Sequence, residues 1–225
     1  MRGSHTFVLG GDIFDFRWSQ WANHDQTVEH GLRWLQGLAA VNPECQIHYL
    51  LGNHDAHPVF TGELTRLAER IPNLVVHPHL LRLEDCVFLH GDIIDANIPF
   101  EGDFHELLNA KRLQEERRAR PPKIQHTLYD AAVKARLHRL VSTVVNGNQK
   151  VLDRVTRYLK WAGHGPSSGV RKVYFGHTHR PLDAVPYAGM RFFNPGATIK
   201  GLDFRIVPVD LDSTVANTPL KDTSA

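Results

Sequence analysis

Residues 46–55 read Gln-Ile-His-Tyr-Leu-Leu-Gly-Asn-His-Asp, and this stretch shows the pattern on which the chain is built. Its first six residues, Gln46–Leu51, are mostly apolar and include β-branched and aromatic side chains, which predicts a short buried strand. The strand runs directly into Gly52, Asn53, His54 and Asp55. An apolar strand with such an ending presents oxygen and imidazole groups at one edge of a sheet.

The same arrangement, an apolar run followed at once by a short polar motif, occurs at three other places. The apolar runs are of the FVLG, CVFL and KVYF type. Oxygen and imidazole groups gathered at one sheet edge are the usual ligands of divalent metals, so the four motifs together predict a metal site built from distant parts of the chain. The three further motifs are Gly11-Asp12-Ile13-Phe14-Asp15, His90-Gly91-Asp92 and Gly176-His177-Thr178-His179.

Each candidate ligand also has a purely structural interpretation. Asp12 and Asn53 are residue types that form turns, and His90 could be a hydrogen-bonded core histidine. His177 and His179 are two residues apart, which places both imidazoles on the same side of an extended segment. The occurrence of all four motifs in one chain favours metal binding over these alternatives.

The composition indicates a globular protein without a strong charge bias. The 225 residues are enough for one large α/β domain, and the net charge of +2 gives no reason to expect nucleic acid or a membrane surface as a partner. Cys45 and Cys86 lack metal-finger spacing and are interpreted as reduced, buried thiols, with a disulfide as the alternative. No apolar stretch approaches the ~20 residues of a membrane span and no signal peptide is visible, so a cytoplasmic location is expected.

Hydrophobic periodicity predicts strands that alternate with helices, and hence an α/β architecture. Helices are expected over Thr27–Ala40 and Phe60–Arg70. From Phe104 to Trp161 the sequence is mostly helical, which we interpret as a helical insertion, or cap, within a single domain that covers residues 1–225. Strands are expected at Thr6–Gly10, Gln46–Leu51, Leu74–His77, Leu80–Leu83, Cys86–Leu89, Val170–Phe175, Met190–Phe193 and Phe204–Val209.

The order and wording of the four motifs resemble the calcineurin-like metallophosphoesterase superfamily. The resemblance runs from Thr6 to about Leu211 and implies a two-sheet β-sandwich flanked by helices, with a helical insertion before the last metal-binding motif. It also implies two divalent metal ions (Mn, Fe, Zn or Mg) held ~3.5–4 Å apart. By resemblance Asp12 would bridge the two ions. Asn53, His90 and His177 would complete the second site, and His179 would bind the first metal.

Proteins of that superfamily begin with a strand that ends in Asp-x-His and supplies two more ligands of the first metal. This chain starts with Met-Arg-Gly-Ser-His and enters the second strand at once. His5 has no Asp two residues before it, and we expect its side chain to be exposed to solvent. We therefore expect an N-terminally truncated domain with a complete second metal site and an incomplete first one, which would bind its metal weakly or not at all.

His54 has a different role in the resemblance, close to the scissile phosphate and not on a metal. As an imidazolium it could stabilise the phosphoryl oxygens or protonate the leaving oxygen, oriented by a hydrogen bond to Asp15. Asp15 could instead cap a turn. The implied reaction is hydrolysis of a phosphoester or pyrophosphate bond by in-line attack of a metal-bridging hydroxide. Asp55 and Asp92 could orient the metal ligands through hydrogen bonds without binding the metal themselves.

The helical insertion carries a basic cluster that has two interpretations. It could clamp a second phosphate or a nucleotide, or it could be a solvated helix face paired with Glu115 and Glu116, which we favour. Its apolar residues could pack the helices or line a groove for an acyl chain. The cluster comprises Lys111, Arg112, Arg117, Arg118, Arg120, Lys123, Arg136 and Arg139.

The layout is similar to that of one branch of the superfamily, the UDP-2,3-diacylglucosamine pyrophosphatases, which share the insertion and the ending of Gly176–Pro181. That branch usually has Arg where this chain has His54, so a lipid-linked substrate, and with it a location at the periphery of a membrane, remains one option beside a nucleotide-linked one. Nuclease or cyclic-nucleotide phosphodiesterase activity is an alternative, although long nucleic acid is not expected as a partner. A catalytically impaired relative that acts as a binding protein is another. The sequence indicates no oligomeric state.

Overall fold

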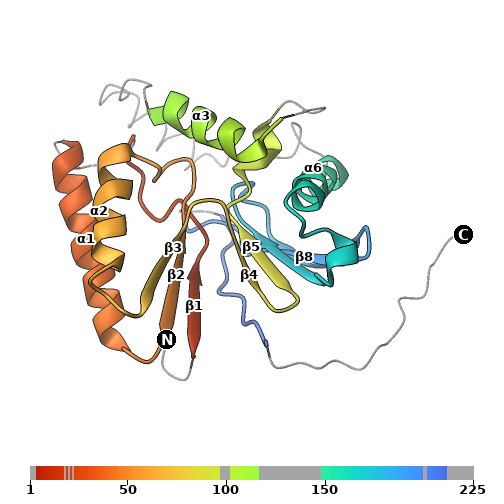
Figure 1. Ribbon diagram of the computed structural model, residues 1–225, viewed down its shortest axis with the longest axis horizontal. Coiled ribbons are helices and arrows are strands. Elements are labelled where there is room, and N and C mark those ends of the chain that lie inside the picture. Colours follow the sequence, from red (N-terminus) through yellow and green to blue (C-terminus); the bar gives the residue numbers. More distant parts are fainter. Residues whose placement is uncertain are drawn as a thin grey trace, which may run out of the picture.

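The computed structural model describes residues 4–17, 19, 21, 23–96, 102–116, 148–199 and 202–211. They form an α/β structure with two sheets and helices on the outer faces, as the sequence predicted (Figure 1). The central part of the expected helical insertion lies outside the described residues. So do six members of the basic cluster: Arg117, Arg118, Arg120, Lys123, Arg136 and Arg139.

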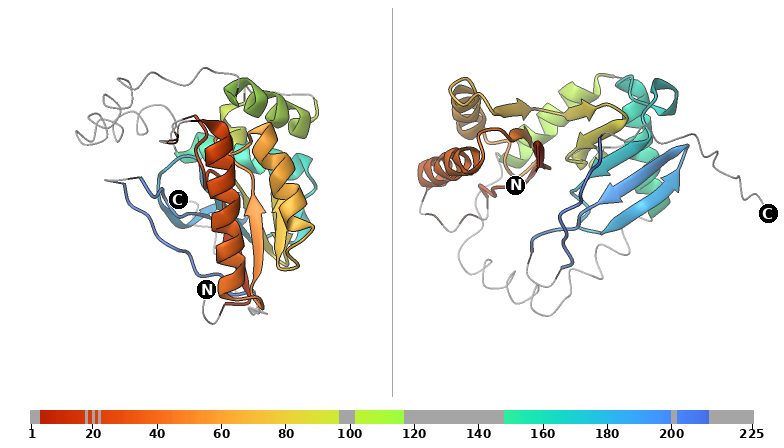
Figure 2. Two further views of the ribbon diagram at one scale, coloured as in Figure 1. Left: turned by 90° about the vertical axis from the view of Figure 1, so that its left-hand side faces the viewer. Right: turned by 90° about the horizontal axis from the view of Figure 1, so that it is seen from below.

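The first sheet has three parallel strands in the order β1 (Thr6–Leu9), β2 (Gln46–Leu50) and β3 (Leu74–His77). Its outer face is covered by α1 (His24–Val41) and α2 (Pro58–Ala68) (Figures 1 and 2). All five elements contribute to one hydrophobic cluster. Parallel strands need such cover because they are joined by crossover helices and not by hairpins.

The second sheet has five strands in the order β4, β5, β6, β8 and β7. Its central strands β5, β6 and β8 are mutually parallel, and β4 and β7 are antiparallel to their neighbours at the two edges. The outer face packs against α3 (Phe104–Glu116) and α6 (Asn148–Trp161), with the short 3-10 helix η1 (Asp92–Asp95) between them. A second 3-10 helix, η2 (Pro166–Ser168), precedes β6. The strands are β4 (Leu80–Leu83), β5 (Cys86–Leu89), β6 (Lys172–Phe175), β7 (Leu182–Tyr187) and β8 (Met190–Asn194).

A third hydrophobic cluster joins the two sheets. Leu50 comes from β2, whereas Leu81, Cys86 and Phe88 come from β4 and β5. This layer makes the order of the molecule helix, sheet, sheet, helix (Figure 2). Cys45 and Cys86 are both buried and free, as predicted.

The first helix is longer than its apolar periodicity predicted. Asn23 caps it: the side-chain Oδ1 accepts a hydrogen bond from the backbone N–H of Gln26 at 2.9 Å. The cap lies one turn before Thr27, where the predicted helix began, because a capping residue satisfies backbone donors without any apolar signal. Val28, Leu35 and Ala39 are buried on the inner face of the helix, and Leu32 and Leu38 are partly buried beside them.

Two predictions about the C-terminal strands were wrong. Phe204–Val209 forms no strand: only an isolated bridge links Phe204 to Gly196, Ile206 is 73% exposed, and Pro208 lacks the N–H that a ladder requires. The strand β7 was not predicted because Pro186 lies within it. Proline is tolerated there because β7 is an edge strand with a register shift near its start.

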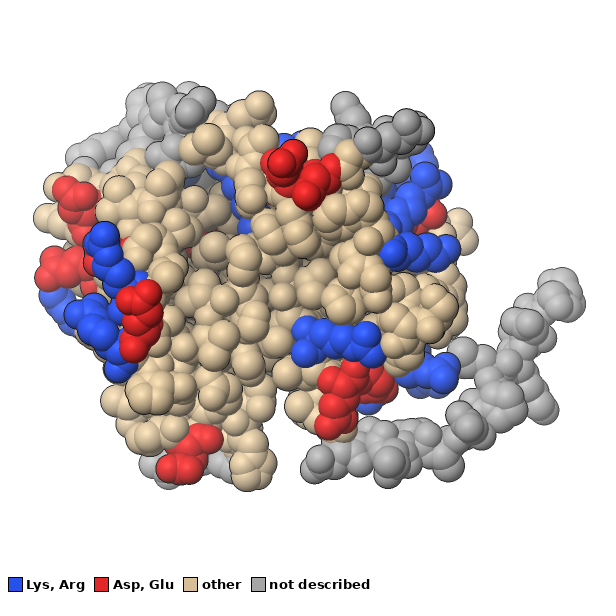
Figure 3. Space-filling model, in the orientation of Figure 1, with Lys and Arg blue, Asp and Glu red and all other residues tan. Residues whose placement is uncertain are grey.

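Charged side chains are mixed in sign where they are visible. On the face shown in Figure 3, Lys and Arg stand beside Asp and Glu around the periphery, and the centre of that face carries few charges. Among the described helices there is none with the length and the apolar composition that crossing a bilayer requires.

Candidate metal centre

Three of the predicted ligands meet at the edge where strands of both sheets end. Asp12 follows β1, His90 follows β5 and His177 follows β6. A carboxylate oxygen of Asp12 and one ring nitrogen of each histidine all lie within 4.8 Å of one another. Asn53, which follows β2, adds its amide oxygen at 3.1 Å from His90 Nε2. The four sequence motifs are therefore brought together in space.

The orientation of His90 is fixed by a backbone carbonyl. Its side chain is 2% exposed, and its Nδ1–H donates to the carbonyl oxygen of Gly10 at 3.0 Å. Its Nε2 therefore faces the centre, 3.1 Å from Asp12 Oδ2 and 3.3 Å from His177 Nδ1. An imidazole whose second nitrogen donates to an oxygen is the usual arrangement of a histidine that binds a metal.

His177 has the same arrangement with a carboxylate in place of the carbonyl. Its Nε2 lies 2.8 Å from Asp95 Oδ2, and its Nδ1 is directed at His90. The hydrogen bond to His177 helps to lower the pKa of Asp95, against the effect of burial, which raises it. Asp95 was not identified from the sequence. The sequence indicates only that Asp95 lies three residues after Asp92. In a 3-10 helix such as η1, residues three apart lie on the same side.

The charges at this centre are strongly coupled. Burial alone raises the pKa of Asp12, but the facing His90, with His54, holds that pKa well below its usual range. For His90, burial lowers the pKa and the Asp12 carboxylate more than reverses this, so the net shift is upward. In the absence of an ion, the ionised forms of Asp12 and His90 therefore stabilise each other.

The residues present fit a divalent cation. Asp12 Oδ2, Asn53 Oδ1 and His177 Nδ1 all direct lone pairs at His90 Nε2, and an ion that displaced the proton of Nε2 would gain a fourth lone pair there. A single proton on His90 cannot bond well to three partners at once, whereas an ion with mixed oxygen and nitrogen ligands can. Carboxylate, amide and imidazole together suit Mn, Fe, Zn or Mg.

The backbone at the candidate ligands is strained. Asp12, His177 and His179 have positive φ values of 53°, 59° and 55°. Residues other than glycine rarely adopt this left-handed conformation, and such strain is concentrated at functional sites. The neighbouring Gly52 is required for close packing, because a Cβ there would lie 2.1 Å from Asp12 Oδ1.

The buried carboxylate of Asp55 holds two loops of the centre in place. Asp55 is fully buried and accepts hydrogen bonds from the Tyr49 hydroxyl at 2.6 Å and from the backbone N–H groups of Ile13 and Gly52 at 3.0 and 2.6 Å. It thereby ties the Asp12 loop to the Asn53 loop. Burial, with the nearby Asp12, raises the pKa of Asp55 to about 6.

For Arg112 itself, both interpretations of the basic cluster are wrong. It is 4% exposed and forms two hydrogen bonds with the Asp92 carboxylate, so it neither lies on a solvated helix face nor is available to clamp a phosphate. A third bond, from Nη2 to the carbonyl of Leu51 at 2.9 Å, links α3 to the end of β2. Asp92 therefore supports the centre through Arg112 and not through a ligand.

His54 and Asp15 form the predicted contact beside the centre. His54 Nδ1 lies 3.1 Å from Asp15 Oδ2, and both side chains are partly exposed. The backbone N–H of His54 donates to Asp12 Oδ1 at 2.8 Å, which fixes the imidazole next to the candidate ligands. His179 is exposed and does not belong to the group within 4.8 Å. Its role as a ligand of another ion stays a prediction.

A comparison of the chain with the models of known protein families, with curated proteins and with solved structures found no match in any of the three.

Proposed function

We propose that this chain is a metal-dependent hydrolase of a phosphoester or pyrophosphate bond, of the calcineurin-like metallophosphoesterase type. The observation that carries the proposal is the meeting of four lone-pair atoms from the ends of four different strands. Two of them belong to imidazoles whose other nitrogens already bond to Gly10 and Asp95. Such a donor set, placed at the carboxyl ends of strands, is suited to phosphate chemistry.

A divalent ion bound there would act as a Lewis acid and would lower the pKa of a water molecule for attack on phosphorus. The remaining steps belong to the chain. Since His54 directs its Nδ1 at Asp15, Nε2 is the nitrogen that exchanges a proton with the leaving oxygen. Asp15 keeps the ring oriented. His54 would therefore be the general acid and Asp15 its positioning residue.

The substrate in this proposal is small. The mixed charges on the visible face and the net charge of +2 do not form the basic surface that long nucleic acid requires. A nucleotide-linked or lipid-linked phosphate both remain compatible with the metal centre itself. The proposed location is cytoplasmic.

The test measures metal content and hydrolysis of bis-p-nitrophenyl phosphate on the same sample with added Mn²⁺. The native chain should bind metal and turn over. His54→Ala should keep the metal and lose ~10²–10⁴-fold in kcat, the usual contribution of a general acid. His177→Ala should lose both metal and turnover. His5→Ala, an exposed histidine before β1 and so at the opposite end of that strand from Asp12, is the control and should change neither.

A second candidate, a metal-binding protein without hydrolase activity, is favoured by one observation. Among the described residues a single group of His, Cys, Asp or Glu side chains is close enough to hold an ion, and it leaves His179 out. Metal bound by the native chain, lost in His177→Ala and accompanied by no turnover in any sample, would select this alternative and overturn the hydrolase.

A further inference from the structure

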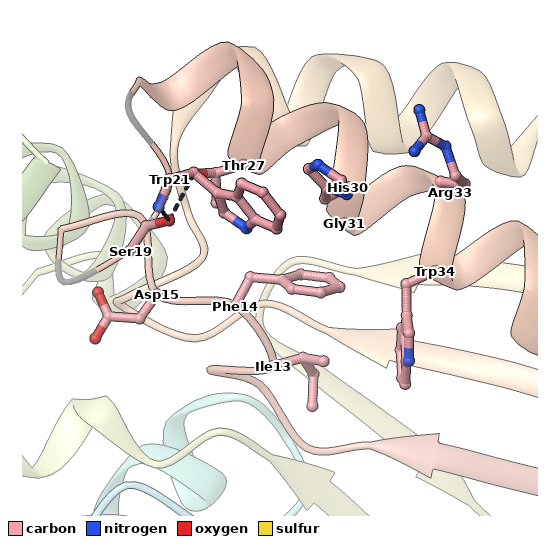
Figure 4. A pocket seen from close by; sticks show the side chains of 10 residues that line it. All are labelled: Ile13, Phe14, Asp15, Ser19, Trp21, Thr27, His30, Gly31, Arg33 and Trp34. Carbon is pink, nitrogen blue, oxygen red and sulfur yellow. Dashed lines mark hydrogen bonds between the residues drawn. The ribbon is translucent and has the colours of Figure 1, made fainter.

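An open pocket of about 590 Å³ lies beside the candidate metal centre, between the loop that follows β1 and the first half of α1 (Figure 4). Its volume falls within the ~300–1,000 Å³ typical of small-molecule sites. Ile13, which directly follows the candidate ligand Asp12, lines the pocket, and so does Asp15, the partner of His54. The loop that carries Asp12 and Asp15 is therefore also a wall of the pocket.

Four of the ten lining residues carry aromatic rings. Trp34 is 46% exposed and meets Phe14 edge to face, with ring centroids 5.7 Å apart. Trp21 stacks on His30 with centroids 3.8 Å apart and planes 11° from parallel. Figure 4 shows these four side chains around the hollow, with the Asp15 carboxylate pointing away from the rings. Rings of this kind hold another planar ring by stacking or by edge contacts.

The pocket also contains polar atoms that an alkyl chain would not use. The hydroxyls of Ser19 and Thr27 are hydrogen-bonded to each other at 2.8 Å, and both residues belong to the lining. The imidazole of His30 lies at the wall, stacked on Trp21, whereas the guanidinium of Arg33 is paired with Glu29 and points away from the hollow (Figure 4). An acyl chain would cover the remaining lone pairs of the two hydroxyls and the polar edge of His30 without forming hydrogen bonds with them. A heterocyclic ring with its own nitrogen and oxygen atoms can both stack and form hydrogen bonds.

We propose that this pocket binds a planar heteroaromatic ring, such as a nucleobase, attached to the phosphate that reacts at the candidate metal centre. The position of the phosphate rests on the proposed function, whereas the ring site rests on the pocket alone. A series of contacts joins the pocket to the centre: Asp15 lines the pocket and contacts His54, whose backbone N–H donates to Asp12. In this proposal the ring and the phosphate therefore belong to one substrate. The pocket thus favours a nucleotide-like substrate over a lipid-linked one.

The test is calorimetric titration of the whole chain with Mn²⁺ present, which requires no turnover. Adenosine 5′-monophosphate, ribose 5-phosphate and n-octyl phosphate share a phosphate and differ in what fills the pocket. Adenosine 5′-monophosphate should bind at least ~10-fold more tightly than ribose 5-phosphate, since a good aromatic contact contributes about that factor. Adenosine without phosphate should bind weakly but measurably.

Trp34→Ala and Trp34→Leu should each bring the affinity for adenosine 5′-monophosphate to within ~3-fold of that for ribose 5-phosphate, because each loses the ring. The leucine variant keeps apolar volume and guards against a folding defect in the alanine variant. Trp161→Ala is the matched control: this tryptophan is 42% exposed on α6, outside the pocket, and its loss should leave all three affinities unchanged.

Equal binding of adenosine 5′-monophosphate and ribose 5-phosphate by the native chain would overturn the ring site. Tighter binding of n-octyl phosphate than of either would overturn it in favour of an acyl groove. The failure of the proposed function is a different result: it would leave adenosine binding sensitive to Trp34 in a chain that hydrolyses no phosphodiester. Turnover without any preference for the ring would support the proposed hydrolase function and overturn the ring site.

Discussion

The guanidinium of Arg112 binds the carboxylate of Asp92 through two parallel hydrogen bonds, Nε to Oδ2 at 2.7 Å and Nη2 to Oδ1 at 3.0 Å. Both groups are buried, and Asp92 lies two residues after His90. Burial raises the pKa of Asp92, and Arg112 reverses that shift, so the net pKa is lowered. The pair links α3 to the loop that carries a candidate ligand.

Arg112→Met should therefore be strongly destabilising. It would leave the Asp92 carboxylate buried without its partner, which costs ~3–5 kcal/mol of unfolding free energy. Arg66→Met is the control, because Arg66 forms an exposed pair with Glu63 one helical turn away and should lose less than ~1 kcal/mol. Urea unfolding followed by circular dichroism measures both. Similar losses in the two variants would show that the buried pair contributes no more than a surface pair.

Asp95→Asn should weaken metal binding without removing it. The amide cannot supply the negative charge that makes His177 a stronger ligand, and loss of such a supporting carboxylate typically costs ~10–100-fold in affinity. Titration calorimetry with Mn²⁺ gives the change. Asp183→Asn, which removes a charge from an exposed pair with Arg205, should bind Mn²⁺ as the native chain does. Unchanged affinity in Asp95→Asn would mean that the contact to His177 does not orient a ligand.

Alanine at two glycines should have opposite effects. At Gly52 the new Cβ would lie 2.1 Å from Asp12 Oδ1, so Gly52→Ala should displace the Asp12 loop and lower metal affinity by at least ~10-fold. At Gly37, within α1, no atom lies within 4 Å of the new Cβ, and Gly37→Ala should stabilise the fold by ~0.5–1 kcal/mol through helix propensity. Metal titration and thermal unfolding of both variants provide the readouts. Gly52→Ala with native metal affinity would refute the close approach.

Burial lowers the pKa of His79 to about 4, with smaller contributions from His105 and Arg112. In the unfolded chain this group titrates near the ordinary histidine value of 6.5. Between these two values the unfolded state binds more protons, so the contribution of His79 to stability is present above pH 6.5 and is lost as the pH falls toward 4. His79→Phe should therefore make the unfolding free energy decrease less steeply over that range.

At neutral pH the same variant should be as stable as the native chain or slightly more stable. Phenylalanine can keep the stack on His105, where ring centroids are 4.0 Å apart, and it removes Nδ1, a buried atom without a hydrogen-bond partner in the described part of the chain. Urea titrations at pH 7, 6, 5 and 4 measure the slope. His164→Phe, at a histidine whose pKa is also lowered by burial but which lies outside this stack, shows whether any effect is specific. Parallel pH profiles of the native chain and His79→Phe would contradict the assignment.

The sequence predicted the parts of the fold that leave a periodic signal. Strand Leu74–His77 and strand Cys86–Leu89 have the bounds predicted for them, because apolar runs and their turn residues mark both ends. β7 was missed because local propensity at Pro186 disagrees with its place at a sheet edge, which only the tertiary structure defines. Phe204–Val209 was predicted as a strand on apolar content, although no strand partner exists for it among the described residues.

The candidate site divides in the same way. Asp12, Asn53, His90 and His177 were predicted because each ends a strand, and the structure brings them together. The residues that hold these ligands and their loops in place were harder to predict. Asp95 reaches His177 across 82 positions of sequence, and Arg112 reaches Leu51 across 61. No local sequence pattern predicts either contact, because the partners are far apart along the chain. A charged side chain such as Arg112 can be buried only with a partner, and here folding brings that partner close.

The four lone-pair atoms of the centre come in equal numbers from the two sheets, Asp12 and Asn53 from one and His90 and His177 from the other. An ion that bound all four would therefore act as a removable cross-link at one edge of the sandwich. The shared hydrophobic layer would still join the sheets elsewhere. Removal of the ion by a chelator would therefore weaken the contact between the sheets at this edge without separating them. Thermal stability would then follow the free metal concentration.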